Sequence, residues 1–326
     1  MGSEKILSIV IPSYNVSRYL PEVIPTYLVP EILDKLELLI VNDGSKDDTA
    51  EIAARFAERY PDTIKVINKE NGGHGSTINT GAVAASGKYF KVIDGDDWVD
   101  SACLVKFINV LCETDVDMVL NSFVRVLDGT GEREVRKIKG LESERIYDFK
   151  RIIPIIQDSY AMHGTTFKTE VFRKAKRIDE HCFYVDQEYL MYPAQYVSKT
   201  IYFDIPLYQY RIGNSEQSMS LKNMQRNRKM HEKVIKSLLD NLTTISDGDK
   251  VKELVRYRAA KMCQLQIDIL ISIHDKAEAK RELLSFMDMV KNIDRETYKS
   301  IPGKKAKLIR VTGGVGYDLI KAIKRG

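Results

Sequence analysis

The stretch at residues 87–98, GKYFKVIDGDDW, places the strongest constraint on the fold of this chain. Its apolar run, residues 89–93, is short and lies between turn signals, which is typical of a buried strand. Three carboxylates, Asp94, Asp96 and Asp97, follow directly and are interrupted by one glycine. They therefore lie just past the carboxyl end of a strand, the edge at which open α/β sheets bind their ligands.

The spacing of the first two acids favours a metal site. Asp94 and Asp96 are two residues apart, so a bend at Gly95 can turn both carboxylates towards one point. Hard oxygen ligands of this kind suit Mg²⁺ or Mn²⁺, usually shared with substrate phosphates. The structural alternative is an acidic turn in which Asp97 or Asp100 caps the next helix.

Strand and helix patterns alternate along the first part of the chain. Short apolar, β-branched runs predict strands at residues 6–11, 37–41, 64–67, 116–126, 200–203 and 206–210. Helical spacing between the early strands predicts parallel βαβ units with right-handed crossovers. From about residue 221 strand signals stop and helical periodicity takes over. The sequence therefore predicts an α/β domain at residues 1–220 and a helical extension at residues 221–326.

The early strands end in polar loops, and a parallel sheet gathers such loops at one edge. The loops are residues 12–15 (PSYN), 42–45 (NDGS), 72–76 (GGHGS) and 94–97 (DGDD). Asp43 can accept hydrogen bonds from a ribose hydroxyl or a base N–H. The glycine-rich loop can bring backbone N–H groups close to an anionic ligand. Together with the acid pair, these loops indicate a nucleotide-diphosphate site.

Composition is that of an ordinary globular protein. The 326 residues carry a formal net charge of +4, which is too small to indicate a nucleic-acid partner. The four cysteines show no paired metal-ligand spacing, and they fit reduced thiols in a cytoplasmic protein. No apolar run approaches the length of a membrane span.

The last part of the chain is basic. Between residues 301 and 326, seven Lys/Arg accompany one acid, Asp318. After a glycine-rich break at residues 313–316, four apolar residues can share one helical side: Tyr317, Leu319, Ile320 and Ile323. This pattern predicts an amphipathic segment that contacts the inner face of the cell membrane. The alternative is a solvated, disordered end.

The ordered set of motifs resembles the family-two glycosyltransferases of the GT-A fold. The matching pieces are SIVIPSYN (residues 8–15), LLIVNDGSKDDT (38–49), NGG (71–73) with Asn79 and Gly81, and GKYFKVIDGDDW (87–98). Each piece is short, but their order and spacing over roughly the first hundred residues are specific. The resemblance implies an α/β, Rossmann-like nucleotide-sugar-binding domain with a mostly parallel sheet and flanking helices.

The resemblance also implies roles for individual residues. Asp186 would act as the catalytic base, with Glu188, two residues on, as a competing candidate. Asp96, together with Asp94, would hold Mn²⁺ or Mg²⁺. The nucleotide site would consist of Pro12, Tyr14, Asn15, Asp43, Gly73, Asp94, Gly95 and, at the diphosphate, Arg211.

These roles imply an inverting, metal-dependent glycosyltransferase of the hexosyltransferase type, with a UDP-sugar as the expected nucleotide-diphosphate donor. The acceptor would be a hydroxyl of a glycan or lipid-linked molecule in cell-surface polysaccharide synthesis. Two alternatives stay open: a catalytically silent nucleotide-sugar-binding scaffold, and a nucleotidyltransferase. The loop at residues 12–15 lacks the Gly-rich, basic signature expected of the latter. The helical extension could pair two copies of the chain into a homo-oligomer.

Overall fold

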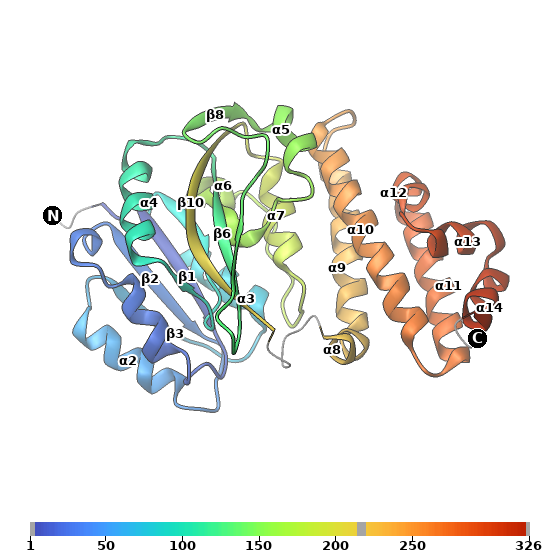
Figure 1. Cartoon of the computed structure of the whole chain (residues 1–326), viewed down its shortest axis with the longest axis horizontal. Helices are drawn as coiled ribbons and strands as arrows, with labels where there is room; N and C mark the ends of the chain where they lie inside the picture. Colours follow the sequence, from blue (N-terminus) through green and yellow to red (C-terminus); the bar gives the residue numbers. More distant parts are fainter. Residues whose placement is uncertain (1–3, 214–219, 324–326) are drawn as a thin grey trace. The chain divides into compact units, whose positions relative to one another are not determined.

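The structure, a computed structural model, describes residues 4–213 and 220–323. The chain divides into two compact units, Met1–Asn214 and Ser215–Gly326. The first unit contains the strands, and the described residues of the second form helices and their connections (Figure 1). Within the described ranges, none of the helices combines the length and the apolar character that a membrane crossing requires.

A single sheet organises the first unit. Its strands are β1 (Leu7–Ser13), β2 (Leu36–Asn42), β3 (Ile64–Asn68), β4 (Tyr89–Val92), β5 (Trp98–Val99), β6 (Met118–Leu127), β7 (Arg133–Arg136), β8 (Arg145–Asp148), β9 (Thr165–Lys168) and β10 (Lys199–Ile212). The order is β3-β2-β1-β4-β9-β6-β10-β5, with β7 beside β6 and β8 beside β10. The first four strands in this order pair in parallel, and so do β6 and β10. The predicted α/β fold with a mostly parallel sheet and C-terminal helices is confirmed.

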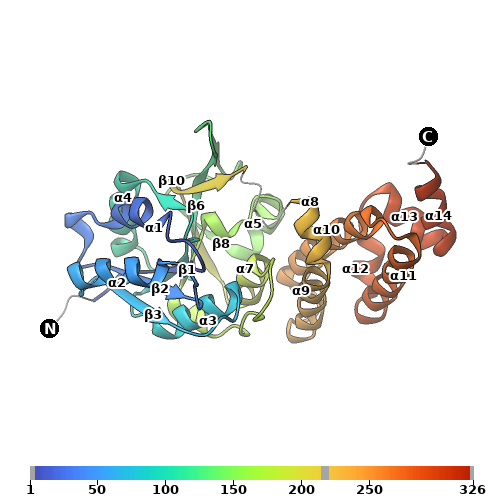
Figure 2. The ribbon, with the colours of Figure 1, turned by 90° about the horizontal axis from the view of Figure 1, so that it is seen from below.

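Helices cover both faces of this sheet (Figure 2). They are α1 (Leu20–Val23), η1 (Ile24–Tyr27), η2 (Pro30–Ile32), α2 (Thr49–Arg59), α3 (His74–Ala84), α4 (Ser101–Glu113), α5 (Phe149–Ile156), η3 (Met162–Gly164), α6 (Thr169–Arg173) and α7 (Asp186–Ala194). Side chains alternate across a strand, so Ile9 and Ile11 of β1 join the core formed with α1, η1 and α4. Val10 meets α3 instead, where a Cβ on Gly81 would lie 2.3 Å from Val10 Cγ2. Glycine at this position therefore lets α3 approach the sheet closely.

The strands predicted at residues 200–203 and 206–210 are one continuous strand, so that prediction is wrong. β10 runs through both segments, and its register against β6 shifts between Phe203 and Tyr208. Pro206, which has no N–H to donate, lies within the shifted segment. A strand tolerates proline at such an irregularity, so the two apolar runs belong to one strand.

The second unit consists of α8 (Leu221–Arg226), α9 (Arg228–Asn241), η4 (Leu242–Thr244), α10 (Lys250–Ser272), α11 (Lys276–Ile293), α12 (Arg295–Ser300), α13 (Lys304–Thr312) and α14 (Gly314–Ile323). Leu238, Leu254 and Leu283 are buried, one on each of the three longest helices. Intra-unit charge pairs, such as Arg256 with Asp294 at 2.9 Å, link the helices at their surface.

Two of the four apolar residues predicted to share one helical side, Tyr317 and Ile320, lie inside this unit, so the prediction of one shared apolar side open to a membrane is wrong for these two. Tyr317 is 1% exposed, Ile320 is 7% exposed, and the Tyr317 hydroxyl donates to the Lys276 carbonyl at 3.2 Å. The two side chains contribute to the unit's own packing. Leu319 is exposed, and the side chain of Ile323 lies outside the described part of the chain.

Candidate functional site

The loops that follow β1 and β2 are tied to each other at the carboxyl edge of the sheet. The Asn15 N–H donates to Ser45 Oγ at 3.0 Å, and the Lys46 N–H donates to Asn15 Oδ1 at 2.8 Å. Asn15 has a φ of 53°, which asparagine tolerates better than most residues. Asn15 thus holds the two loops together, a structural task in addition to any ligand contact.

A cavity of about 770 Å³ opens beside these loops. Tyr14, Asn42, Gly44 and Asn68 are among the residues that line it, and Tyr14 is 50% exposed. Because an exposed aromatic ring at the wall of a cavity can stack on a flat ligand, the predicted nucleotide-site residue Tyr14 is well placed for this role.

Asp43 lies beside this cavity but uses its carboxylate within the protein. It is 2% exposed and accepts hydrogen bonds from the Gly72 N–H at 2.9 Å and the Gly73 N–H at 2.7 Å. Lys69 Nζ donates to the same carboxylate at 2.9 Å. These charge-assisted bonds fix the glycine-rich loop. Gly73, with a φ of 81°, adopts a conformation that favours glycine.

One of the acids after β4, Asp94, contacts a histidine. His74 begins α3, and its Nε2 lies 2.7 Å from Asp94 Oδ1. Burial acts to lower the pKa of His74, but the Asp94 charge, assisted by Asp186 and Asp96, raises that pKa above its ordinary value. For Asp94, burial acts to raise the pKa, but the neighbouring His74 outweighs this effect and the pKa is lowered. His74 thus joins the loop after β3 to the loop after β4, and the negative charge of Asp186, at the start of α7, also acts on its ring.

Asp96 and Asp97 have different surroundings. Burial and the neighbouring Asp94 charge raise the pKa of Asp96. Asp97 is 1% exposed and accepts from the Tyr208 hydroxyl and the Arg211 N–H, both at 2.7 Å. Asp97 therefore anchors β10. The helix-capping alternative holds for Asp100, which accepts from the Cys103 N–H at 2.9 Å.

Gly95 and Pro12 are in close contact at the turn between these acids. A Cβ on Gly95 would lie 2.8 Å from the Pro12 carbonyl oxygen. Any larger residue would push the loop away from β1. The two positions therefore set the separation between the first loop and the carboxylates.

Arg211 lies against one side of the loop that carries the carboxylates, residues 94–97. Its Nε donates to the Asp96 carbonyl at 3.1 Å, and its Nη1 lies 3.2 Å from Asp128 Oδ1. The guanidinium carbon lies 4.9 Å from the centre of the Trp98 ring and 5.1 Å from that of Tyr19. Planar cation–aromatic contacts hold it against the loop. A diphosphate contact by Arg211 stays a prediction.

Asp186 and Glu188 both belong to the first turn of α7, but only one of them is open to the site. Asp186 is partly exposed, accepts from Gln187 Nε2 at 2.7 Å, and lies close enough to raise the pKa of His74. Glu188 is fully buried and accepts from the Asp179 N–H at 2.7 Å and the Tyr192 hydroxyl at 3.0 Å. Its bonds are structural, so the geometry favours Asp186 as the reactive acid.

Asp94 and Asp96 provide oxygen ligands suited to a divalent metal ion. Within residues 4–213 and 220–323, no three His, Cys, Asp or Glu side chains form a complete metal cage. Mg²⁺ and Mn²⁺ need no such cage when a substrate diphosphate completes their coordination. Burial and the Asp94 charge together raise the pKa of Asp96, and a bound cation would offset both effects. The donor set therefore fits a metal shared with a diphosphate.

Three residues that contact the predicted acids could not be identified as site residues from the sequence. His74, Lys69 and Tyr208 contact the predicted acids Asp94, Asp43 and Asp97 respectively. The one available signal was the position of His74 inside the glycine-rich loop, between strand-ending motifs. Lys69 and Tyr208 carry no comparable signal.

Three comparisons with known proteins bear on this site. A family model described as Glycosyl transferase family 2 matches residues 8–175, slightly more than half of the chain. The uncharacterized glycosyltransferase EpsJ of Bacillus subtilis is 39% identical over 114 residues, covering 35% of this chain and 33% of that protein. The minor teichoic acid biosynthesis protein GgaB of the same organism is 30% identical over 178 residues, 54% of this chain and 19% of that protein. The chain thus spans a third or less of the length of these two relatives.

Among solved structures, S. aureus TarS residues 1–349 in complex with UDP-GlcNAc has a similar fold. The TM-score is 0.66 at 16% sequence identity, and the match covers 98% of this chain and 91% of that one. At this identity the likeness concerns the fold.

Proposed function

The chain belongs to glycosyl transferase family 2, and we propose that it is an inverting transferase that uses a UDP-sugar and a glycan or lipid-linked acceptor in cell-surface polysaccharide synthesis. The observation that supports this proposal is the contact of Asp94 with His74, on which the charges of Asp96 and Asp186 also act, together with the cavity that Tyr14 lines. TarS, of similar fold, binds UDP-GlcNAc, and GgaB acts in teichoic acid biosynthesis.

In this proposal the cavity beside β1 and β2 holds the nucleotide. Tyr14 stacks on the base, and Asn42 offers its side chain at the cavity wall. Asp43 acts mainly through the Gly72 and Gly73 backbone that it holds in place. Arg211, fixed beside the carbonyl of Asp96, faces the diphosphate.

Asp96, with Asp94, would hold Mn²⁺ or Mg²⁺, which supplies positive charge to the leaving diphosphate. Asp186 takes the proton of the acceptor hydroxyl while the hydroxyl oxygen of the acceptor forms a bond to the anomeric carbon of the donor sugar. The bond from that carbon to the diphosphate breaks in the same step, so the configuration inverts. His74 orients the Asp94 carboxylate through their hydrogen bond.

The alternatives are less well supported by the same residues. A silent scaffold would need no base beside the carboxylates, whereas Asp186 is partly exposed there. A nucleotidyltransferase would need a Gly-rich, basic loop after β1, and residues 12–15 are PSYN.

The test is the thermal stability of the full chain with UDP-sugars and GDP-sugars, with and without Mn²⁺. A UDP-sugar with Mn²⁺ should raise the melting temperature with the logarithm of its concentration, as selective binding to the folded state requires. Asp96→Asn should remove the part of the melting-temperature increase that depends on Mn²⁺. The control Asp62→Asn changes an exposed acid before β3 and should leave that part unchanged. The proposal is wrong if no nucleotide sugar stabilises the chain, or if excess EDTA leaves both stabilisation and donor hydrolysis unchanged.

A further inference from the structure

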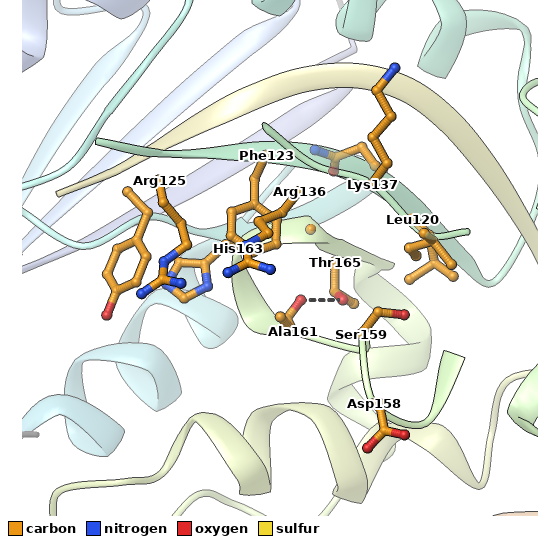
Figure 3. A pocket seen from close by; sticks show the side chains of 14 residues that line it. Leu120, Phe123, Arg125, Arg136, Lys137, Asp158, Ser159, Ala161, His163 and Thr165 are labelled. Carbon is orange, nitrogen blue, oxygen red and sulfur yellow. Dashed lines mark hydrogen bonds between the residues drawn. The ribbon is translucent and has the colours of Figure 1, made fainter. Parts of the chain in front are cut away.

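A second cavity, of about 380 Å³, lies within the first unit on the β6 side of the carboxylates. Residues of β6, the β7 segment, η3 and β10 line it (Figure 3). Phe123 contributes an apolar ring to the lining, and His163 and Tyr210 contribute two further rings.

His163 and Tyr210 lie against each other in the lining of this cavity. Their ring centres are 4.0 Å apart. Burial raises the pKa of Tyr210 to about 12, and the charges of Asp97, Asp94 and Asp186 contribute to that rise. The His163 ring centre also lies 4.9 Å from that of Tyr208, whose hydroxyl donates to Asp97 and accepts from the Asp94 N–H. The cavity therefore adjoins a side chain that is bonded to the loop of the carboxylates.

Two buried polar atoms at the cavity have no hydrogen-bond partner in the described part of the chain. They are Asn121 Oδ1 and His163 Nδ1. Asn121 is 2% exposed, and its Nδ2 donates to the Ser122 carbonyl at 2.7 Å, which fixes the amide orientation. Burial lowers the pKa of His163 to about 4, so its ring is neutral at pH 7. Buried atoms of this kind are satisfied by a ligand or by water, and sugar hydroxyls suit both.

The open end of the cavity carries two arginines. Arg125 and Arg136 share one carboxylate, Glu134, at 3.6 and 3.0 Å. Figure 3 shows both guanidinium groups near His163, with Asp158 at the other end of the cavity and Lys137 directed away; Lys137 pairs with Asp204. Partly exposed ion pairs are weak. Two guanidiniums sharing one acid can therefore take a second anion in a bidentate manner.

We propose that this cavity is an acceptor subsite for a negatively charged sugar unit, one that bears a carboxylate or a phosphate. The proposal rests on the transferase function proposed above and names the chemical class of its acceptor. Asn121 and His163 bind hydroxyls, Phe123 covers an apolar face of the ring, and Arg125 with Arg136 binds the anion.

The experiment follows the five histidine signals of the full chain, labelled with ¹³C-histidine, by NMR. His163→Asn assigns the His163 signal. Glucose, glucuronic acid, glucose 6-phosphate and inorganic phosphate are titrated separately, and UDP-induced thermal shifts are recorded on the same samples. At least one charged sugar should shift the His163 signal at an about tenfold lower concentration than glucose, because charged hydrogen bonds add to the shared hydroxyl contacts. The charged sugar that responds identifies carboxylate or phosphate as the recognised group.

Arg125→Gln combined with Arg136→Gln should raise the half-saturating concentration of that charged sugar about tenfold, to the level of glucose. Arg59→Gln, an exposed arginine at the end of α2, should leave it unchanged. Arg136→Gln alone, on the exposed strand β7, gives a smaller loss in the same direction and serves if the double variant is unstable. The inference is overturned if glucose or inorganic phosphate shifts the His163 signal at the same concentration as the charged sugars. It is also overturned if the double variant still binds the charged sugar more tightly than glucose, or if the His163 signal responds to none of the probes. If UDP still raises the melting temperature of the chain in that case, only this inference is wrong. If no nucleotide raises the melting temperature, the proposed function is wrong as well.

Discussion

At the scale of single residues, α7 gives two acids in one helical turn opposite tasks. Glu188 is fully buried, and burial raises its pKa to about 7. Its two oxygens hold the Asp179 N–H and the Tyr192 hydroxyl. Asp186 is partly exposed and close to His74. A general base must reach its substrate, and of these two acids only Asp186 has exposed surface. The raised pKa of Glu188 would suit a base, but its burial would not.

We therefore predict that Asp186→Asn lowers the rate of UDP release from the donor by about two to four orders of magnitude, which is typical for loss of a positioned base. The melting-temperature increase caused by the UDP-sugar should stay close to that of the wild type, since Asp186 does not bind the nucleotide. Stopped assays of UDP with a saturating acceptor measure the rate.

Glu188→Gln is the matched control. A glutamine can still accept from the Asp179 N–H, so this variant should fold and keep most of its activity. A larger loss of turnover in Glu188→Gln than in Asp186→Asn, with both variants folded, would show that the base is assigned to the wrong acid.

At the scale of elements, a buried lysine joins β4 to the chain around η3 and β9. Lys91 has no exposed surface, and its Nζ donates to the His163 carbonyl at 2.9 Å and the Thr165 carbonyl at 3.3 Å. Burial lowers its pKa to about 7. The amine thus fixes the segment that carries His163, at a cost in electrostatic free energy while it is charged.

This cost makes stability depend on pH in a definite direction. Between pH 7 and about 10.5 the unfolded chain keeps the Lys91 proton while the folded chain releases it, so the free energy of unfolding rises with pH. Below pH 7 both states are protonated and the cost is constant. At about 1.4 kcal/mol per pKa unit, the rise amounts to at most about 5 kcal/mol. Lys91→Met should remove this rise.

Urea unfolding followed by the fluorescence of Trp98, the single tryptophan, reports on the first unit. The free energy of unfolding of the wild type minus that of Lys91→Met should rise steadily from pH 7 to pH 10. Lys65→Met, at an exposed position of β3, should instead follow the wild type. Parallel pH profiles for wild type and Lys91→Met would mean that the buried amine does not titrate in this window.

The elements also show what sequence reasoning can reach. The βαβ half and its four loops were predictable because each strand is a local apolar run that ends in its own polar motif. Contacts between distant segments were not. His74 meets Asp94 across 20 residues, Asn79 binds the Ile178 carbonyl across 99, and Tyr208 binds Asp97 across 111. The antiparallel β9 between β4 and β6 depends on such contacts, since local alternation predicts only parallel neighbours.

At the scale of the whole molecule, the basic end presents a different apolar surface from the one its sequence suggests. Tyr317 and Ile320 are buried in the helical unit, while Val311, Val315 and Leu319 are 76%, 62% and 49% exposed. Val315 and Leu319, four residues apart on α14, share one face. Lys304 and Lys307 on α13 are exposed as well. Exposed apolar side chains beside lysines fit an anionic membrane surface, where a lipid-linked acceptor would be found.

We predict that the full chain sediments with liposomes containing anionic lipid and much less with neutral ones. Each lysine near the surface contributes about 1 kcal/mol, which high salt screens. Val311→Ser, Val315→Ser and Leu319→Ser together should lower the partition coefficient at least about tenfold, because the apolar area that leaves water on binding is lost.

The matched control changes three exposed apolar residues of the first unit to serine, namely Val83, Ile146 and Ile155, and should have little effect on the partition coefficient. Point changes are preferable to truncation at Ser300, which would remove the buried Ala306, Ile309 and Tyr317 from the core of the second unit. Equal binding to neutral and anionic liposomes, or equal losses in the two triple variants, would exclude α13 and α14 as the membrane-contacting surface.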